Sequence, residues 1–125
     1  MIRDLSLDYP DFLIASSEWF AFIPAKEYFD EPGDHADELE TSVMMHYHPE
    51  LVNLDEAGDG NYKKFASQML NEKVAWIPRN WQNVSQDTGI GNPKKASAGK
   101  GKKYAEAVVA KYALLFEELV HKELY

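Results

Sequence analysis

His35 is the residue best placed by type and position to move a proton, because it lies among carboxylates where a helix is expected to begin. Asp34 precedes it, and Asp37 and Glu38 follow within three residues. Asp34 is of a type preferred at helix N-caps, and acidic side chains suit the first helical turn. These signals predict a helix over about residues 35–47 that begins at His35.

The predicted helix start acts on the His35 imidazole in two opposing ways. The positive end of the helix dipole disfavours the imidazolium ion, whereas the neighbouring carboxylates favour it. Helical spacing also places Leu39, Val43 and Tyr47 on one apolar stripe. The sequence therefore predicts a proton-exchanging histidine beside a packed helix face and does not fix its protonation state.

Composition limits the chain to one core and to few kinds of site. Its 125 residues are 45% hydrophobic, which suffices for one core and is too little for two ordinary domains. The lack of cysteine excludes disulfides, thiolate metal sites and cysteine nucleophiles. Neither a signal-peptide pattern nor an apolar run of the roughly 18 residues that a membrane span needs is present. We therefore expect a soluble, cytoplasmic protein.

Charge is divided unevenly between the two halves. Residues 1–60 carry two basic and 15 acidic side chains, a net charge of −13, whereas residues 61–125 carry 11 basic and six acidic ones, a net charge of +5. The acidic half repels phosphate backbones, which argues against nucleic acid binding and for attraction of divalent cations. Among the crowded acids of residues 27–40, we expect a solvated face that contains Glu27, Asp30, Asp37 and Glu38.

Two short apolar runs predict strands of a sheet. Residues 12–15 (FLIA) have the pattern of a strand buried on both faces of a parallel sheet, and residues 74–77 (VAWI) predict a second strand. Ligands in open α/β sheets gather beyond the carboxyl ends of the strands, which places Trp19 near any pocket. A tryptophan of the core is the alternative.

Helical patterns account for much of the remainder. We expect a helix over residues 1–9, a short helix within residues 62–70, and a long C-terminal helix whose apolar stripe, from Tyr104 to Val120, covers the sheet. The glycine-rich residues 88–101 predict a turn that enters this last helix, with Asn92 or Ser97 as N-cap. They lack the Walker pattern, and most of the five lysines between Lys94 and Lys103 are expected to face solvent.

Other candidate residues favour packing over chemistry. His46 and His48 are spaced for a metal on a strand, but at a helix end followed by proline they diverge, so we expect surface or packing histidines. Arg79 beside Trp81 indicates stacking within the fold rather than substrate binding. No G-x-S-x-G or H-E-x-x-H pattern is present, so nucleophilic hydrolysis by a side chain is unsupported.

Two stretches resemble the creatininase (creatinine amidohydrolase) family. Residues 33–45 (GDHADELETSVMM), followed by HPELV, resemble the family segment in which an acid–His pair opens a helix and an E-T-S triplet follows. Residues 88–101 (TGIGNPKKASAGKG) resemble its small-residue loop and next helix. The resemblance implies an α/β, creatininase-like layered domain with a mostly parallel sheet flanked by helices. It places residues 1–125 as the C-terminal half of that single domain.

The resemblance also implies a reaction and a cofactor. Such enzymes are metal-dependent amidohydrolases of non-peptide amides, cyclic ones included, and hold a divalent metal pair, zinc or manganese. Their ligands lie mainly in the N-terminal half, on a glycine-rich loop and nearby His, Asp and Glu residues that this chain lacks. We therefore assign no metal ligand here and expect the isolated chain to be inactive.

Roles for five residues follow from the same resemblance. His35 is the candidate proton shuttle, Asp34 would orient the substrate or the imidazole, and Glu40 would hold the helix or support the site from behind. Trp19 matches a tryptophan that lines the family's site. Glu31 falls where creatininase itself has a lid tryptophan, so it is a candidate substrate contact and argues against creatinine as the substrate.

Two alternatives stay open at this point. The chain is either part of an enzyme or a non-catalytic protein, namely a truncated product or a subunit that pairs with a separate N-terminal half. Within the family, a deformylase of a nucleotide-precursor formamide is the alternative to a cyclic-amide hydrolase. In each case we expect a homo-oligomer or a missing N-terminal half as partner, and neither nucleic acid nor a membrane.

Overall fold

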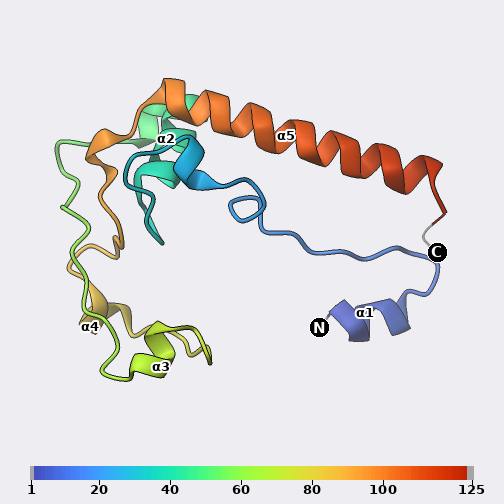
Figure 1. Cartoon of the computed structure of the whole chain (residues 1–125), viewed down its shortest axis with the longest axis horizontal. Coiled ribbons are helices and arrows are strands. Elements are labelled where there is room, and N and C mark those ends of the chain that lie inside the picture. Colours follow the sequence, from blue (N-terminus) through green and yellow to red (C-terminus); the bar gives the residue numbers. More distant parts are fainter. Residues whose placement is uncertain (1, 124–125) are drawn as a thin grey trace.

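The chain, described from residue 2 to residue 123 by a computed structural model, is largely helical (Figure 1). Its α-helices are α1 (Ile2–Asp8), α2 (Glu38–Tyr47), α3 (Gln68–Asn71), α4 (Trp81–Val84) and α5 (Ala98–His121). Short 3-10 turns are η1 (Ala25–Glu27), η2 (Pro49–Leu51) and η3 (Pro93–Lys95). Helix α2 packs on the N-terminal end of α5, whereas α1, α3 and α4 lie away from that pair.

The predicted α/β layered domain with a mostly parallel sheet is wrong for the described residues. Their only strand-like pairing is one antiparallel bridge, between His35 and Ile90. Residues 12–15 and 74–77, which were expected to be strands, have irregular backbone, and Phe12 and Trp76 are 69% and 83% exposed. A buried parallel strand needs paired neighbours on both edges, and residues 2–123 supply none. An apolar run alone therefore does not make a sheet.

A small core holds α2, α5 and the segment before them together. Ile23, Phe29, Leu39, Tyr104 and Val108 form it, and Trp19 packs against its edge. The Tyr104 side chain is fully buried, and its hydroxyl donates to the carbonyls of Phe20 (3.2 Å) and Ile23 (3.3 Å). Burial raises the pKa of this phenol, so it stays a neutral donor.

Helix α2 begins three residues later than predicted. Asp37 is its N-cap, because the Asp37 carboxylate accepts a hydrogen bond from the Glu40 N–H at 2.9 Å. Both Asp34 and Asp37 are good cap types, but only Asp37 has a glutamate three residues later, the capping-box spacing. His35 consequently lies before the helix, and Asp34 is not its cap. The predicted end is confirmed at Tyr47.

The long C-terminal helix is confirmed, but its predicted role of covering a sheet is wrong. Ser97 caps α5 by accepting from the Lys100 N–H at 3.3 Å, and Asn92 caps η3 in the same way. The buried residues of α5 all lie in its first three turns, at the end where α2 packs. Phe116, further along the apolar stripe, is 62% exposed.

The other helical predictions are confirmed in part. Helix α1 matches the helix expected over residues 1–9, apart from Met1, which lies outside the described residues. The short helix expected within residues 62–70 is reduced to α3, which begins only at Gln68. Ser67 caps it, because its hydroxyl accepts from the Leu70 N–H.

Candidate active site

His35 is held by the backbone of a segment far away in the sequence. The N–H groups of Asp34 and His35 both donate to the Ile90 carbonyl, at 2.8 and 3.0 Å, and the Ile90 N–H donates to the His35 carbonyl at 2.8 Å. Ile90 itself is buried. The backbone of the acid–His pair is therefore anchored, while the imidazole is 45% exposed and open to a ligand.

Glycines allow the two segments to approach this closely. A Cβ atom on Gly33 would lie 2.6 Å from the Ile90 carbonyl oxygen, and one on Gly91 would lie 2.7 Å from Asp37 Cβ. Gly91 also has a φ of 125°, which other residues rarely adopt. The glycines singled out in the sequence thus serve the anchoring of His35.

Glu40 connects His35 to the start of α2. One oxygen of its carboxylate accepts from the Ala36 N–H at 2.6 Å and lies 3.6 Å from His35 Nδ1. Ala36 has a φ of 49°, a conformation that costs about 1–3 kcal/mol outside glycine. This strained turn takes the chain from His35 into the helix. Glu40 is thus placed to stabilise an imidazolium ion.

Asp34 does not face a free site, because Arg79 binds it. An Arg79 guanidinium nitrogen lies 2.6 Å from the Asp34 carboxylate, and both side chains are about one-third exposed. The guanidinium carbon also lies 5.4 Å from the centre of the Trp81 ring. The predicted stacking of Arg79 on an aromatic side chain is confirmed. Trp81 in turn stands 5.0 Å from the His35 ring, tilted by 43°.

A cavity of about 560 Å³ opens beside the helix start. Trp19 and Glu40, two of the predicted site residues, line it. His35 does not line it, but its Nδ1 lies 3.6 Å from the Glu40 carboxylate. The charged side chains that line it, Glu40, Glu56 and Asp87, are all acidic. Trp19 also packs edge-on against Tyr104 at 6.1 Å, so it belongs to both the core edge and the cavity wall.

Glu31, a predicted substrate contact, is bound by two residues of the glycine-rich segment 88–101. Its carboxylate lies 2.6 Å from Lys95 Nζ and accepts from the Asn92 side-chain amide at 3.1 Å. The Lys95 hydrogen bond lowers the pKa of Glu31. The structure thus places Glu31 outside the cavity wall and in a surface ion pair.

The expectation that the neighbouring acids form a solvated face is wrong for Asp37 and Glu38, which are buried, whereas Glu27 and Asp30 are exposed as expected. Glu38 is fully buried and pairs with Lys100 Nζ at 2.5 Å, and the same ammonium binds Asp30 at 2.7 Å. Asp37 is buried by its capping role. The expectation that most lysines of residues 94–103 face solvent is confirmed, since Lys100 alone of these five is not exposed. Opposite charges far apart in the sequence cancel here, a pairing that no local pattern reveals.

These ion pairs predict a loss of stability in acid. Lys95 and Lys100 lower the pKa values of Glu31 and Asp30 below their usual 4.5 and 3.8. A carboxyl group with a lower pKa in the folded state stabilises the fold above its unfolded pKa, and the stabilisation is lost as the pH falls toward the folded value. We expect Lys95→Met to weaken the decrease of melting temperature between about pH 5 and pH 3.

Lys102→Met is the matched control, because the Lys102 ammonium lies 3.8 Å from Glu106 on the exposed surface of α5. Its melting curve should keep the acid dependence of the unchanged chain. An identical dependence in Lys95→Met would contradict a role for the Glu31 pair.

Comparison with known proteins identifies the family. Residues 2–116 match the creatininase family, described as creatinine amidohydrolase. The chain belongs to the creatininase family. The resemblance inferred from residues 33–52 and 88–101 is therefore confirmed.

A solved relative shows how much of such a protein this chain represents. The crystal structure of a Bacteroides fragilis protein, named "Putative creatinine amidohydrolase", superposes with a TM-score of 0.90 at 59% sequence identity. The alignment covers 99% of this chain and 49% of the other, so the chain spans about half the length of that relative. No curated protein matches the present chain significantly. None of the helices within residues 2–123 combines the length and hydropathy that a bilayer span requires.

Creatininase-family enzymes depend on metals, but the described residues do not fit a metal pair. Within residues 2–123, no three His, Cys, Asp or Glu side chains gather in a way that could hold a metal ion. His46 lies 4.6 Å from the Tyr47 ring, and His48 Nδ1 lies 3.3 Å from Glu50, as expected of packing and surface histidines. No step of the reaction is therefore assigned to a metal that this chain would hold.

Two features of the site were not predicted from the sequence: the placement of Arg79 and Trp81, and the role of Asp87. Arg79 and Trp81 were expected to stack within the fold, but their position against Asp34 and His35 was not foreseen. Asp87, whose carboxylate accepts from the N–H groups of Gly58 and Gly89, was not singled out at all. Its only local signal is its place directly before the glycine-rich loop.

Proposed function

We propose that this chain provides the proton-transfer side of a metal-dependent amidohydrolase site that acts on a non-peptide amide, cyclic amides included. The observation that carries the proposal is the placement of His35, which is anchored through its backbone and exposed through its ring. Its backbone is fixed by Ile90, its Nδ1 faces Glu40 at 3.6 Å, and its ring is 45% exposed. An anchored, accessible histidine beside a carboxylate is suited to general acid–base work near neutral pH.

In the proposed reaction, water adds to the amide carbonyl and a tetrahedral intermediate forms. His35 would take up the proton that the water releases and then, as imidazolium, donate it to the nitrogen as the carbon–nitrogen bond breaks. Glu40 would stabilise that cation through its nearby carboxylate, and Arg79 keeps Asp34 from competing for it. Zinc or manganese, expected in the complete family enzyme, would be bound by residues outside those described here.

The acidic lining of the cavity bears on the substrate. Because Glu40, Glu56 and Asp87 repel anions, the cavity suits a neutral or cationic amide better than a phosphorylated one. This argues for a small uncharged amide over the formamide of a nucleotide precursor. Glu31, occupied by Lys95 and Asn92, would contact a substrate only from the rim.

The non-catalytic alternative also has support, because much apolar surface lies open. Phe12, Leu13, Leu114, Phe116 and Val120 are each more than half exposed, on the N-terminal segment and on α5. Such surfaces favour association with another polypeptide. We therefore propose that activity requires a partner that supplies metal ligands and covers these side chains, namely a polypeptide equivalent to the other half of the Bacteroides fragilis relative.

One experiment separates these possibilities. The purified chain is mixed with Zn²⁺ or Mn²⁺. A second polypeptide, the half of the Bacteroides fragilis relative that the alignment with this chain leaves out, is either added or omitted. Complex formation is followed by light scattering, and hydrolysis is assayed on creatinine, other lactams and a formamide. We expect turnover of an uncharged amide only in the mixture. Turnover by the chain alone would contradict the need for a partner, and a stable, metal-loaded complex without turnover would contradict the enzyme function.

A further inference from the structure

Arg79 and Trp81 form a connected set of planar groups behind the acid–His pair. The Arg79 guanidinium binds the Asp34 carboxylate at 2.6 Å and lies 5.4 Å from the Trp81 ring centre. The Trp81 ring lies 5.0 Å from the His35 imidazole. Residues 79–81 therefore contact both members of the pair, one through charge and the other through an aromatic ring.

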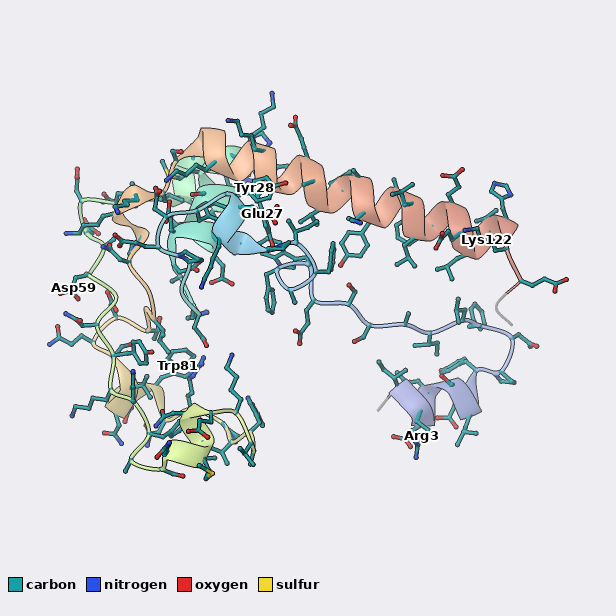
Figure 2. All side chains as sticks on the ribbon, in the orientation of Figure 1. Arg3, Glu27, Tyr28, Asp59, Trp81 and Lys122 are labelled. Carbon is teal, nitrogen blue, oxygen red and sulfur yellow. The ribbon has the colours of Figure 1, made fainter. Side chains whose placement is uncertain are left out.

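The hydrophobic core does not explain these contacts. No residue of α4 is buried, and neither Arg79 nor Trp81 belongs to the core cluster. Figures 1 and 2 show α4, with Trp81 labelled, well away from the packed pair of α2 and α5. The segment that contains Arg79 and Trp81 adds nothing to the core, yet these two side chains contact Asp34 and His35.

We infer that Arg79 and Trp81 are positioning residues that set the orientation of the His35 imidazole. The inference rests on the proposed function, in which that ring transfers a proton. The bridge to Ile90 fixes the His35 backbone but not the rotation of its exposed ring. The Trp81 ring limits that rotation on one side of the imidazole. The Glu40 carboxylate, 3.6 Å from His35 Nδ1, limits it on another side.

Arginine is suited to this task in a way that lysine is not. Its planar guanidinium can stack on an indole and bind a carboxylate at the same time, whereas a lysine ammonium supplies only the charge. Arg79 thus fixes Trp81 through stacking. It also neutralises the negative charge of Asp34, so that this charge acts less on the imidazole. Glu40 remains as the carboxylate that faces His35 Nδ1.

The positioning role is tested on the full chain by NMR of the histidine ring protons, which respond to the ring current of a nearby indole. We expect the His35 signals to shift in Trp81→Leu and Arg79→Gln. Trp81→Phe, which keeps an aromatic face, should restore most of the original shift, and Arg79→Lys only part of it. Trp76→Leu and Arg3→Gln are matched controls, since Trp76 is 83% exposed and Arg3 lies on α1 (Figure 2).

Kinetics in the active mixture provide the second readout. A misplaced acid–base group lowers kcat and leaves substrate binding nearly intact, so we expect kcat to fall about 10- to 100-fold in Trp81→Leu with KM changed little. Unchanged His35 signals together with an unchanged kcat in Trp81→Leu and Arg79→Gln would overturn the inference. Circular dichroism identifies a variant that fails to fold; Trp81→Met or Arg79→Met, which likewise removes the indole or the guanidinium, then takes its place.

The failure of the inference can be told apart from failure of the proposed function. Normal turnover in His35→Ala would overturn the proposed function, and with it any catalytic purpose of positioning. Lost turnover in His35→Ala, with normal signals and rates in the variants of Arg79 and Trp81, would overturn the positioning role alone.

Discussion

His35→Ala is expected to lower kcat for amide hydrolysis by about 10²- to 10⁴-fold, the usual contribution of a positioned acid–base group. The melting temperature should change little. The imidazole is 45% exposed and lies outside α2, and the backbone bridge to Ile90 does not depend on the side chain. Both quantities are to be measured on the same preparation, with kcat from the active mixture and the melting temperature from the chain alone.

His48→Ala is the matched control, because His48 is also an exposed histidine beside a glutamate, 3.3 Å from Glu50. It lies beyond the end of α2, away from the acid–His pair, and should keep normal turnover. If His35→Ala had a normal rate, or a loss of rate matched by unfolding, His35 would have no place in the mechanism.

The site could be predicted from the sequence to the extent that its signals are local. The order Asp34, His35, Glu40 carries the family resemblance, and in the structure the Glu40 carboxylate lies 3.6 Å from His35 Nδ1. The signal for the helix start is also local, because Asp37 alone of the two candidate caps has a glutamate three residues later. The pairing of Asp34 with Arg79, 45 residues further along the chain, has no such local signal.

The fold was the weaker prediction, for a related reason. An apolar run such as residues 12–15 indicates what a segment could bury, whereas a sheet needs partners that the run itself cannot specify. Long-range charge pairing was equally hidden. Glu38 has the pattern of a solvated first-turn acid. It is nevertheless fully buried, where its carboxylate forms an ion pair with Lys100 of α5.

Gly101→Ala is expected to destabilise the fold by about 3 kcal/mol, the upper part of the usual range for an overpacked contact. Gly101 lies in α5 where the helix crosses α2, and it is buried. A Cβ atom there would overlap the Ser42 carbonyl group and lie 2.8 Å from the Val43 nitrogen. The obstacle is helix backbone, which cannot turn aside as a flexible side chain could, so α2 and α5 must separate.

Separation of the helices would also reach the site. Ser42 is fully buried, and its hydroxyl accepts from the Ser97 N–H at 3.1 Å, so the start of α5 is tied to the helix that carries Glu40. Gly99→Ala is the matched control on the same helix, because a Cβ atom at Gly99 meets nothing within 4 Å. Alanine has the higher helix propensity, so this control should be neutral or stabilising by up to about 1 kcal/mol. Equal denaturation midpoints for the two variants would show that the close crossing of α2 and α5 does not hold the chain together.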